Sequence, residues 1–255
     1  MKLLLQTDDV TIVEKRVVRH AAMLTDAQLS FASLNSLQHG HINPDIPVDA
    51  VPVGTVEFVS AVMAAREIDQ PAHLSYPECL RHFLCRDVWE GEFGDTNGNV
   101  FVKPRHEIKS FTGALLSDLD PCQTIATDFP VWFSSPVEFI SEWRYYVLCG
   151  KVVGAGRYDD GEDNSSEPSI STVLDAAFAM SQSGNGLSGY ALDFGVLRDG
   201  RTALVEANDG WALGYYKRDT SVALTSHEGG CSAVDYAKLL HARWLQMAFP
   251  SRGAT

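Results

Sequence analysis

The chain has 255 residues, of which 45% are hydrophobic, enough for a sizeable core and for more than one lobe. Its formal net charge of −13 argues against nucleic acid and against an anionic membrane surface as partners, because phosphate groups are bound by basic surfaces. Five scattered cysteines favour reduced thiols in a cytoplasmic protein over a disulfide framework or a zinc site. The apolar run after Met1 is too short for a signal peptide, and no stretch approaches the length of a membrane span.

The first 95 residues have the pattern of an α/β lobe. Residues Lys2–Gln6 predict a first strand, and Val51–Gly54 predicts the end of another strand and a turn. Thr55 is a suitable N-cap for a helix that runs to about Arg66. A second helix is expected over Glu78–Trp89.

The remainder of the chain alternates short strands, turns and two longer helical patterns. In chain order we expect a turn-rich boundary at Gly91–Gly98, strands at Asn99–Pro104 and Val131–Ser134, a hairpin from Glu142 to Tyr158, a helix over Pro168–Gln182, a hairpin around Asp199-Gly200, and a closing amphipathic helix over Ala233–Met247.

The Asp199-Gly200 pair is the strongest hairpin signal, because a type I′ turn needs positive φ at both central residues. A two-residue turn would set Asp193 opposite Glu206, with Cβ atoms roughly 5 Å apart. At an effective dielectric of about 20 their repulsion costs about 3 kcal/mol. A divalent cation is the simplest agent to offset it, and Asn208 would add an amide oxygen on the same face. The open alternative is an exposed hairpin whose two acids extend into water.

The other face of this hairpin is expected to be apolar and to pack on a core. It would place Leu192, Phe194 and Val196 across from Ala207, Val205 and Ala203.

A basic segment follows the N-terminal lobe of this acidic chain. It contains Lys103, Arg105, His106 and Lys109 within seven residues. A strand that delivers a lysine and then opens into a polar loop can bring cations and backbone N–H groups to phosphates. A solvated surface loop is the alternative.

A second hairpin carries two arginines. If Cys149-Gly150 forms a two-residue turn, Glu142 faces Arg157 and shares a face with Arg144. Guanidinium forks suit phosphates and developing oxyanions. The alternative for Arg157 is a simple cross-strand ion pair with Glu142, worth little if it is exposed.

The order of these motifs resembles the ATP-grasp superfamily over roughly residues 98–217, and its RimK-like and D-alanine-ligase-like members most closely. The most specific segments are Glu142–Arg157, and Ala191–Val196 followed by Leu204–Asn208. Family members usually carry a glycine-rich loop after the strand lysine, whereas this chain has His106–Gly113 there. The resemblance is therefore to a divergent branch.

The resemblance implies an α/β protein with α+β subdomains: a small subdomain (residues 96–140) and a large one with the metal hairpin (141–255) grip ATP, beside an N-terminal α/β lobe (1–95). It also implies roles for individual residues. Lys103 and Lys109 would bind the phosphates, Glu138, Phe139 and Ile140 the adenine, Glu142 the ribose, and Asp193, Glu206 and Asn208 Mg²⁺ or Mn²⁺, while Arg144, Arg157 and Lys109 would stabilise the reacting groups.

The implied activity is an ATP-dependent carboxylate–amine ligase that works through an acyl phosphate and releases ADP and phosphate. Its partners would be small-molecule or peptide carboxylates and amines, and a homo-oligomer remains open. Three alternatives stay open: an ATP-grasp kinase or phosphotransferase, a non-catalytic nucleotide-binding module, and an α/β domain with two purely structural hairpins.

Overall fold

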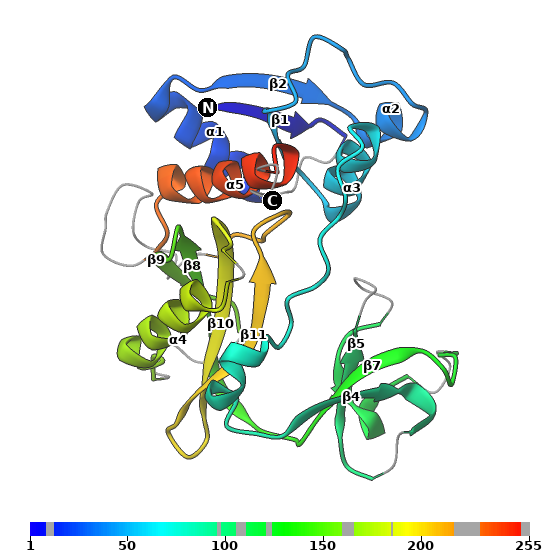
Figure 1. Cartoon of the computed structure of the whole chain (residues 1–255), viewed down its shortest axis with the longest axis vertical. Coiled ribbons are helices and arrows are strands. Elements are labelled where there is room, and N and C mark those ends of the chain that lie inside the picture. The colour runs from blue at the N-terminus through cyan, green and yellow to red at the C-terminus, as the bar shows by residue number, and fades with distance from the viewer. Residues whose placement is uncertain are drawn as a thin grey trace.

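The computed structural model describes residues 1–8, 13–95, 98–105, 111–120, 124–159, 166–184, 186–216 and 230–250. Within these ranges the strands form three sheets: one at the top of Figure 1, one below it, and a small one at the lower right. No helix in the described ranges is long and apolar enough to cross a lipid bilayer.

The N-terminal sheet is parallel, with β1 between β2 and β3. Parallel neighbours need crossover connections, and helices supply them here. The strand predicted at Lys2–Gln6 and the helix predicted to follow the Thr55 cap are both confirmed, with the Thr55 hydroxyl accepting from the Phe58 amide. The elements are β1 (Lys2–Gln6), α1 (Val13–Thr25), β2 (Gln28–Ala32), α2 (Leu34–Gln38), β3 (Val51–Val53) and α3 (Val56–Ala65).

The second sheet is a small antiparallel one with strand order β4-β7-β5-β6. Val102, Phe111, Val131 and Phe133 form its core. Its elements are β4 (Val88–Glu92), the 3-10 turn η2 (Phe93–Asp95), β5 (Phe101–Pro104), β6 (Ala114–Leu115), the 3-10 turn η3 (Leu116–Asp118) and β7 (Pro130–Ser134).

The helix expected over Glu78–Trp89 is wrong. A short 3-10 helix, η1 (Glu78–Phe83), is followed by strand β4. Cys85 lies between them with a φ of 53°, in the left-handed region that ends a helix. Strand β4 pairs with β7 although it precedes the boundary expected at residue 95. The division into lobes at residues 95 and 140 stays a prediction.

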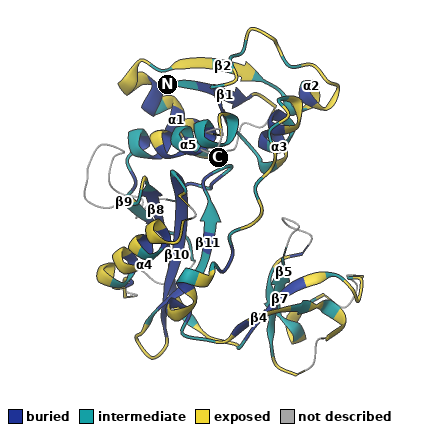
Figure 2. Ribbon diagram, in the orientation of Figure 1, coloured by how far each residue is buried: buried dark blue, intermediate teal, exposed yellow. Residues whose placement is uncertain are grey.

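The central sheet is antiparallel, in the order β11-β10-β8-β9, with a helix on each face. Helix α4 and η1 pack on one face and α5 on the other, where the N-terminal lobe also docks. Strand β10 is buried along its whole length (Figure 2). The elements are β8 (Phe139–Leu148), β9 (Lys151–Arg157), α4 (Ile170–Gln182), β10 (Gly189–Leu197), β11 (Thr202–Asp209) and α5 (Ala233–Ala248).

The β10–β11 turn differs from the predicted type I′ turn. The Gly200 amide donates to the Leu197 carbonyl at 2.8 Å, so Arg198 and Asp199 are the central residues. Only Gly200 of the expected pair has positive φ, at 87°. The loop therefore holds three residues instead of two, which shifts the first part of the ladder by one position.

A β-bulge at Val205 removes this shift. Before the bulge Phe194 pairs with Leu204, and after it Asp193 pairs with Glu206. The predicted Asp193–Glu206 pairing is thus confirmed, although the apolar pairs predicted near the turn are wrong. Two irregularities of one residue each offset one another.

The β8–β9 hairpin starts as predicted, with Leu148 opposite Lys151 across the Cys149-Gly150 turn. A register shift between Tyr146 and Val147 then places Trp143, and not Glu142, opposite Arg157. The predicted Glu142–Arg157 facing pair is therefore wrong.

The same shift moves Gly154 and Gly156 onto the face that carries Arg144. There the chain passes very close to them, and a Cβ atom at Gly154 would lie 2.3 Å from the Cα atom of Cys231. Glycine is required at this close approach.

Gly154→Ala should lower the free energy of unfolding by about 1–3 kcal/mol, because the added methyl group has no space unless the backbone around Cys231 moves. Lys151→Ala, at the exposed start of the same strand, should change it by less than about 0.5 kcal/mol. Urea unfolding measures both. Equal stability of the two variants would contradict the close approach.

Candidate functional site

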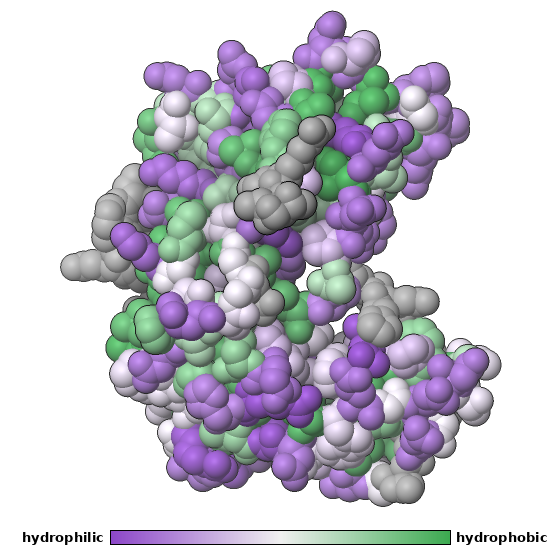
Figure 3. All heavy atoms as spheres, viewed as in Figure 1, coloured by the Kyte–Doolittle hydropathy of each residue, from purple (hydrophilic) through white to green (hydrophobic). Residues whose placement is uncertain are grey.

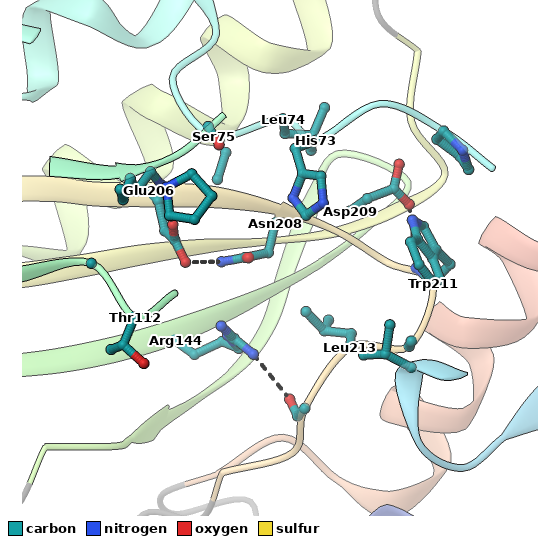
Figure 4. Close-up of a pocket in the computed structure, with 18 of the residues that line it drawn as sticks. His73, Leu74, Ser75, Thr112, Arg144, Glu206, Asn208, Asp209, Trp211 and Leu213 are labelled. Carbon is teal, nitrogen blue, oxygen red and sulfur yellow. Dashed lines mark hydrogen bonds and ion pairs between the residues drawn. The ribbon is translucent and has the colours of Figure 1, made fainter. Parts of the chain in front are cut away.

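A cavity of about 400 Å³ lies between the central sheet and the small lobe, the part of the chain that carries β4 to β7. Figure 3 shows the surface hollowed between the N-terminal part and this lobe. The wall of the cavity is made by β11, the tip of β5, the segment before η1 and the loop after β11. Residues that line it include Lys103, Arg144, Glu206, Asn208, Asp209, His73 and Trp211, several of which are labelled in Figure 4.

Arg144 and Asp193 form a buried ion pair beside this cavity. They are cross-strand neighbours on β8 and β10. The guanidinium donates from Nε to Oδ1 at 2.8 Å and from Nη2 to Oδ2 at 2.7 Å, a bidentate fork. Asp193 is 1% exposed and Arg144 8%. The pair is therefore almost fully removed from water.

Lys103 and Glu206 form a second ion pair, which joins the small lobe to the central sheet. The Lys103 Nζ atom donates to the Glu206 Oε2 atom at 2.6 Å. It also lies 4.4 Å from the centre of the Tyr76 ring. The Asn208 amide connects the two pairs, because its Nδ2 atom donates to Asp193 Oδ2 at 3.0 Å and to Glu206 Oε1 at 3.2 Å.

The repulsion between Asp193 and Glu206 is offset by side chains of the protein, whereas the sequence analysis expected a divalent cation to offset it. Two basic side chains, Arg144 and Lys103, lie against the two carboxylates, so their charge is offset within the described part of the chain. Among the described residues no three His, Cys, Asp or Glu side chains gather as a metal cluster. Asp193, Glu206 and Asn208 lie together as predicted, and their role as metal ligands stays a prediction.

Burial and pairing act against each other in the pKa values of this group. Burial alone would raise the pKa of Glu206, but the Lys103 ammonium and the Arg144 guanidinium outweigh it, and the pKa is lowered. Burial alone would lower the pKa of Lys103, but Glu206 outweighs it, and the pKa is raised. For Asp193 burial is the larger effect and raises the pKa against the pull of Arg144. Pairing thus outweighs burial for Glu206 and Lys103, and burial outweighs pairing for Asp193.

Glu142 and Arg157 have partners other than those expected. Glu142 accepts from the Tyr158 hydroxyl at 2.7 Å. Burial raises the pKa of Glu142, and the charges of Asp193, Asp159 and Glu206 act in the same direction. Arg157 makes a bidentate contact with Asp159, donating from Nε to Oδ2 at 2.9 Å and from Nη2 to Oδ1 at 2.7 Å. The charges of the site therefore act on Glu142, whereas Arg157 is held by Asp159, two residues further along the chain.

The segment expected to bind adenine lies outside the residues that line the cavity. Glu138 is ion-paired to Arg198, and its carbonyl accepts from the Arg198 amide at 3.1 Å. Ile140 is 39% exposed, and Phe139 covers Gly195. The adenine role of these residues stays a prediction. Lys109 and His106 fall outside the described residues.

The segment before η1 lines the cavity, which the sequence analysis did not predict. The Ala207 amide donates to the Ser75 carbonyl at 2.8 Å, an isolated bridge that fastens this segment to β11. Ser75 has a φ of 43°, which is unusual for a residue other than glycine. The bridge carries His73 into the cavity wall (Figure 4). Pro71 and Pro77 are typical of a loop, but no pattern in the sequence indicates that this loop lies beside β11.

The model of the family described as "ATP-grasp domain, R2K clade family 2" matches residues 83–225, more than half of the chain. This range covers the small sheet, the central sheet and both ion pairs. No curated protein is significantly similar to the chain in sequence.

Solved structures share the fold at low sequence identity. N5-carboxyaminoimidazole synthetase from Staphylococcus aureus has a TM-score of 0.56 and 9% identity, over 95% of this chain and 78% of that chain. A RimK-domain ATP-grasp protein from Sphaerobacter thermophilus DSM 20745 has a TM-score of 0.53 and 17% identity, over 94% of this chain and 100% of that chain. The predicted ATP-grasp fold is confirmed.

Arg144→Met should lower the free energy of unfolding by about 3–5 kcal/mol, because it leaves the Asp193 carboxylate buried without its partner. The double variant Arg144→Met with Asp193→Leu should recover most of this loss, since no unpaired charge remains. Denaturant unfolding of the wild type and these variants measures both effects. A single variant as stable as the wild type would show that the pair is not formed in solution.

Proposed function

This chain belongs to family 2 of the R2K clade of ATP-grasp domains, and we propose that it is an ATP-dependent ligase that joins a carboxylate to an amine. The observation that carries the proposal is the Lys103–Glu206 contact. It brings a cation of the small lobe to an acid of the central sheet at the edge of a 400 Å³ cavity, next to the buried Arg144–Asp193 pair.

The chemistry needs activation because a carboxylate has no good leaving group. A carboxylate oxygen attacks the γ-phosphorus of ATP, the bond to the bridging oxygen breaks, and ADP leaves an acyl phosphate behind. The amine then attacks the acyl carbon, loses its proton to solvent, and expels phosphate. Negative charge builds up on oxygen in both steps, so fixed cations at the cavity wall lower both barriers.

Lys103 and Arg144 are the described cations that line this cavity. A nucleotide phosphate would compete with the Glu206 carboxylate for Lys103 and so release Glu206 as a free oxygen donor. Arg144 is held in place by Asp193 and lies 5.0 Å from the centre of the Tyr216 ring, which orients its fork. It is suited to stabilise an oxyanion at the cavity wall.

The donor set fits a magnesium ion only in part. Glu206 and Asn208 line the cavity and offer hard oxygens, and the Glu206 oxygen that accepts from Lys103 becomes free when Lys103 turns to a phosphate. Asp193 is not among the residues that line the cavity, and Arg144 engages both of its oxygens. We propose that Glu206 and Asn208 hold the ion, with Asp193 joining them if Arg144 shifts toward substrate. When bound, Mg²⁺ supplies charge neutralisation for the phosphates.

A smaller cavity of about 240 Å³ adjoins the first and is the proposed place for the amine. The two cavities share Val56 and residues 212–214 of the loop after β11. Glu14 and Glu57 line the smaller cavity, and no basic residue is among its described lining residues. Glu14 is fixed by the Tyr215 amide, which donates to its Oε1 atom at 2.7 Å. A carboxylate-rich wall favours an ammonium group.

Lys103→Met should abolish most of the thermal stabilisation that Mg²⁺ with a non-hydrolysable ATP analogue gives the wild type, because the phosphates lose their cation. Lys2→Met is the matched control, since Lys2 pairs with Asp49 at 3.0 Å in the N-terminal sheet, and it should keep the stabilisation. Thermal unfolding with and without the analogue measures it. An unchanged shift in Lys103→Met would contradict nucleotide binding at this cavity.

The reaction itself is tested by incubating the wild type with ATP, Mg²⁺ and panels of carboxylates and amines. Release of ADP and phosphate with a new amide in the product mass supports the ligase. A phosphorylated product that persists without an amide would instead identify a phosphotransferase. Stabilisation by nucleotide without turnover on any pair would favour a binding module.

Glu14→Gln should raise the KM for the amine by roughly tenfold, the effect of losing about 1.4 kcal/mol of a charge-assisted contact. The thermal shift with the ATP analogue should stay unchanged, because Glu14 lines only the smaller cavity of the two. Steady-state kinetics on any productive substrate pair checks this. An unchanged KM would remove the amine from this cavity.

A further inference from the structure

Two segments connect the small lobe to the rest of the protein, and they run side by side. One precedes β4 and the other follows β7, and these strands are paired. The ribbon extends past the sheet, because the Ser135 amide donates to the Asp87 carbonyl at 3.0 Å. Figure 1 shows this ribbon as the connection between the small sheet and the central sheet. Any rotation of the small lobe must bend it.

Arg86 lies on this ribbon and binds the central sheet through its guanidinium. Its Nη1 atom donates to the Leu204 carbonyl at 2.7 Å and its Nη2 atom to the Val205 carbonyl at 2.9 Å. Nη1 also donates to the Leu84 carbonyl at 3.1 Å. The planar fork thus holds two successive carbonyls of β11 and the backbone of its own segment.

The two carbonyls belong to the β-bulge that sets the register of Glu206. Val205 is the extra residue between the Phe194–Leu204 and Asp193–Glu206 pairs. A bulged residue is left without a partner in the ladder, and β11 is the edge strand of its sheet. Arg86 supplies the missing donors one residue before Glu206.

Arg86 also shares aromatic partners with the site and with the second connecting segment. Its guanidinium carbon lies 5.7 Å from the centre of the Tyr76 ring, and the same ring lies 4.4 Å from the Lys103 Nζ atom. The guanidinium also lies 5.7 Å from the centre of the Phe139 ring, at the end of the segment that follows β7. One side chain therefore contacts both connecting segments, the bulge under Glu206 and the ring beneath Lys103.

We propose that Arg86 is a positioning residue that fastens the small lobe to the bulge of β11 and so sets Lys103 against Glu206. Neither Lys103 nor Glu206 is touched by Arg86; each is placed through a neighbour, Tyr76 or Val205. The use of this contact in catalysis rests on the proposed function, but the positioning does not, since it concerns the protein without nucleotide.

Zero-length carbodiimide coupling followed by peptide mass spectrometry tests the proposal without ATP. The reagent joins an amine to a carboxylate only where the two are in contact, so wild type should give a Lys103–Glu206 cross-link. The Lys2–Asp49 pair of the N-terminal sheet, also at 3.0 Å or less between charged atoms, serves as the internal reference for a folded chain. The ratio of the two cross-links is the quantity measured.

Arg86→Gln should lower this ratio several-fold, because a neutral amide cannot replace the fork and the cation over Tyr76. Arg86→Lys keeps the charge but has a single ammonium that cannot hold both carbonyls as a planar fork, so it too should lower the ratio. Arg201→Gln is the matched control, because Arg201 lies at the β10–β11 turn and pairs with Asp199, and both side chains are exposed. It should leave the ratio unchanged.

If Arg86→Gln or Arg86→Lys gives the same ratio of the Lys103–Glu206 cross-link to the Lys2–Asp49 cross-link as the wild type, the proposal is overturned. Loss of the Lys2–Asp49 reference in Arg86→Gln would mean that this variant is unfolded, and Arg86→Lys then decides. Failure of the chain to turn over ATP would leave the cross-link result standing, so the two proposals fail independently.

Discussion

The centre of this molecule is a row of two positive and two negative side chains that runs across four strands and two lobes: Arg144, Asp193, Glu206 and Lys103. Asp193 lies on β10, the strand buried along its whole length, so its carboxylate can be charged only if its neighbours are fixed. The other features follow from this constraint. The glycines of β9 let the chain close over Arg144, Asn208 joins the two pairs, and the small lobe must stay where Lys103 can reach.

The sequence predicted the parts that depend on local patterns. The first strand, the Thr55-capped helix and the two hairpins are set by periodicity, capping and turn residues, and all were found. The pairing of Asp193 with Glu206 was also correct, but for an incomplete reason. An Asp-Gly turn indicates that strands reverse, and it does not reveal a bulge five residues further along, because bulges depend on side-chain packing and on donors such as Arg86 from elsewhere in the chain.

The parts that could not be predicted are those that depend on contacts distant in sequence. Lys103 reaches Glu206 over 103 positions, and no pattern in either segment indicates the contact. The predicted pairing of Glu142 with Arg157 was wrong for the same reason, since a one-residue shift beyond Tyr146 reverses every later side chain of β9. For the same reason the sequence analysis expected a metal ion to offset the two acids. In the structure Lys103 and Arg144 also offset them.

The Val205 bulge has a consequence for how this hairpin can change over evolutionary time. Deleting Val205 would leave Leu204 and Glu206 as neighbours on β11, each still on its own face of the sheet, so the strand could straighten without moving the acid out of the site. The same deletion would remove one of the two carbonyl groups that Arg86 holds. Relatives with a straight strand here should therefore have no need of an arginine at this point of the connection between the lobes.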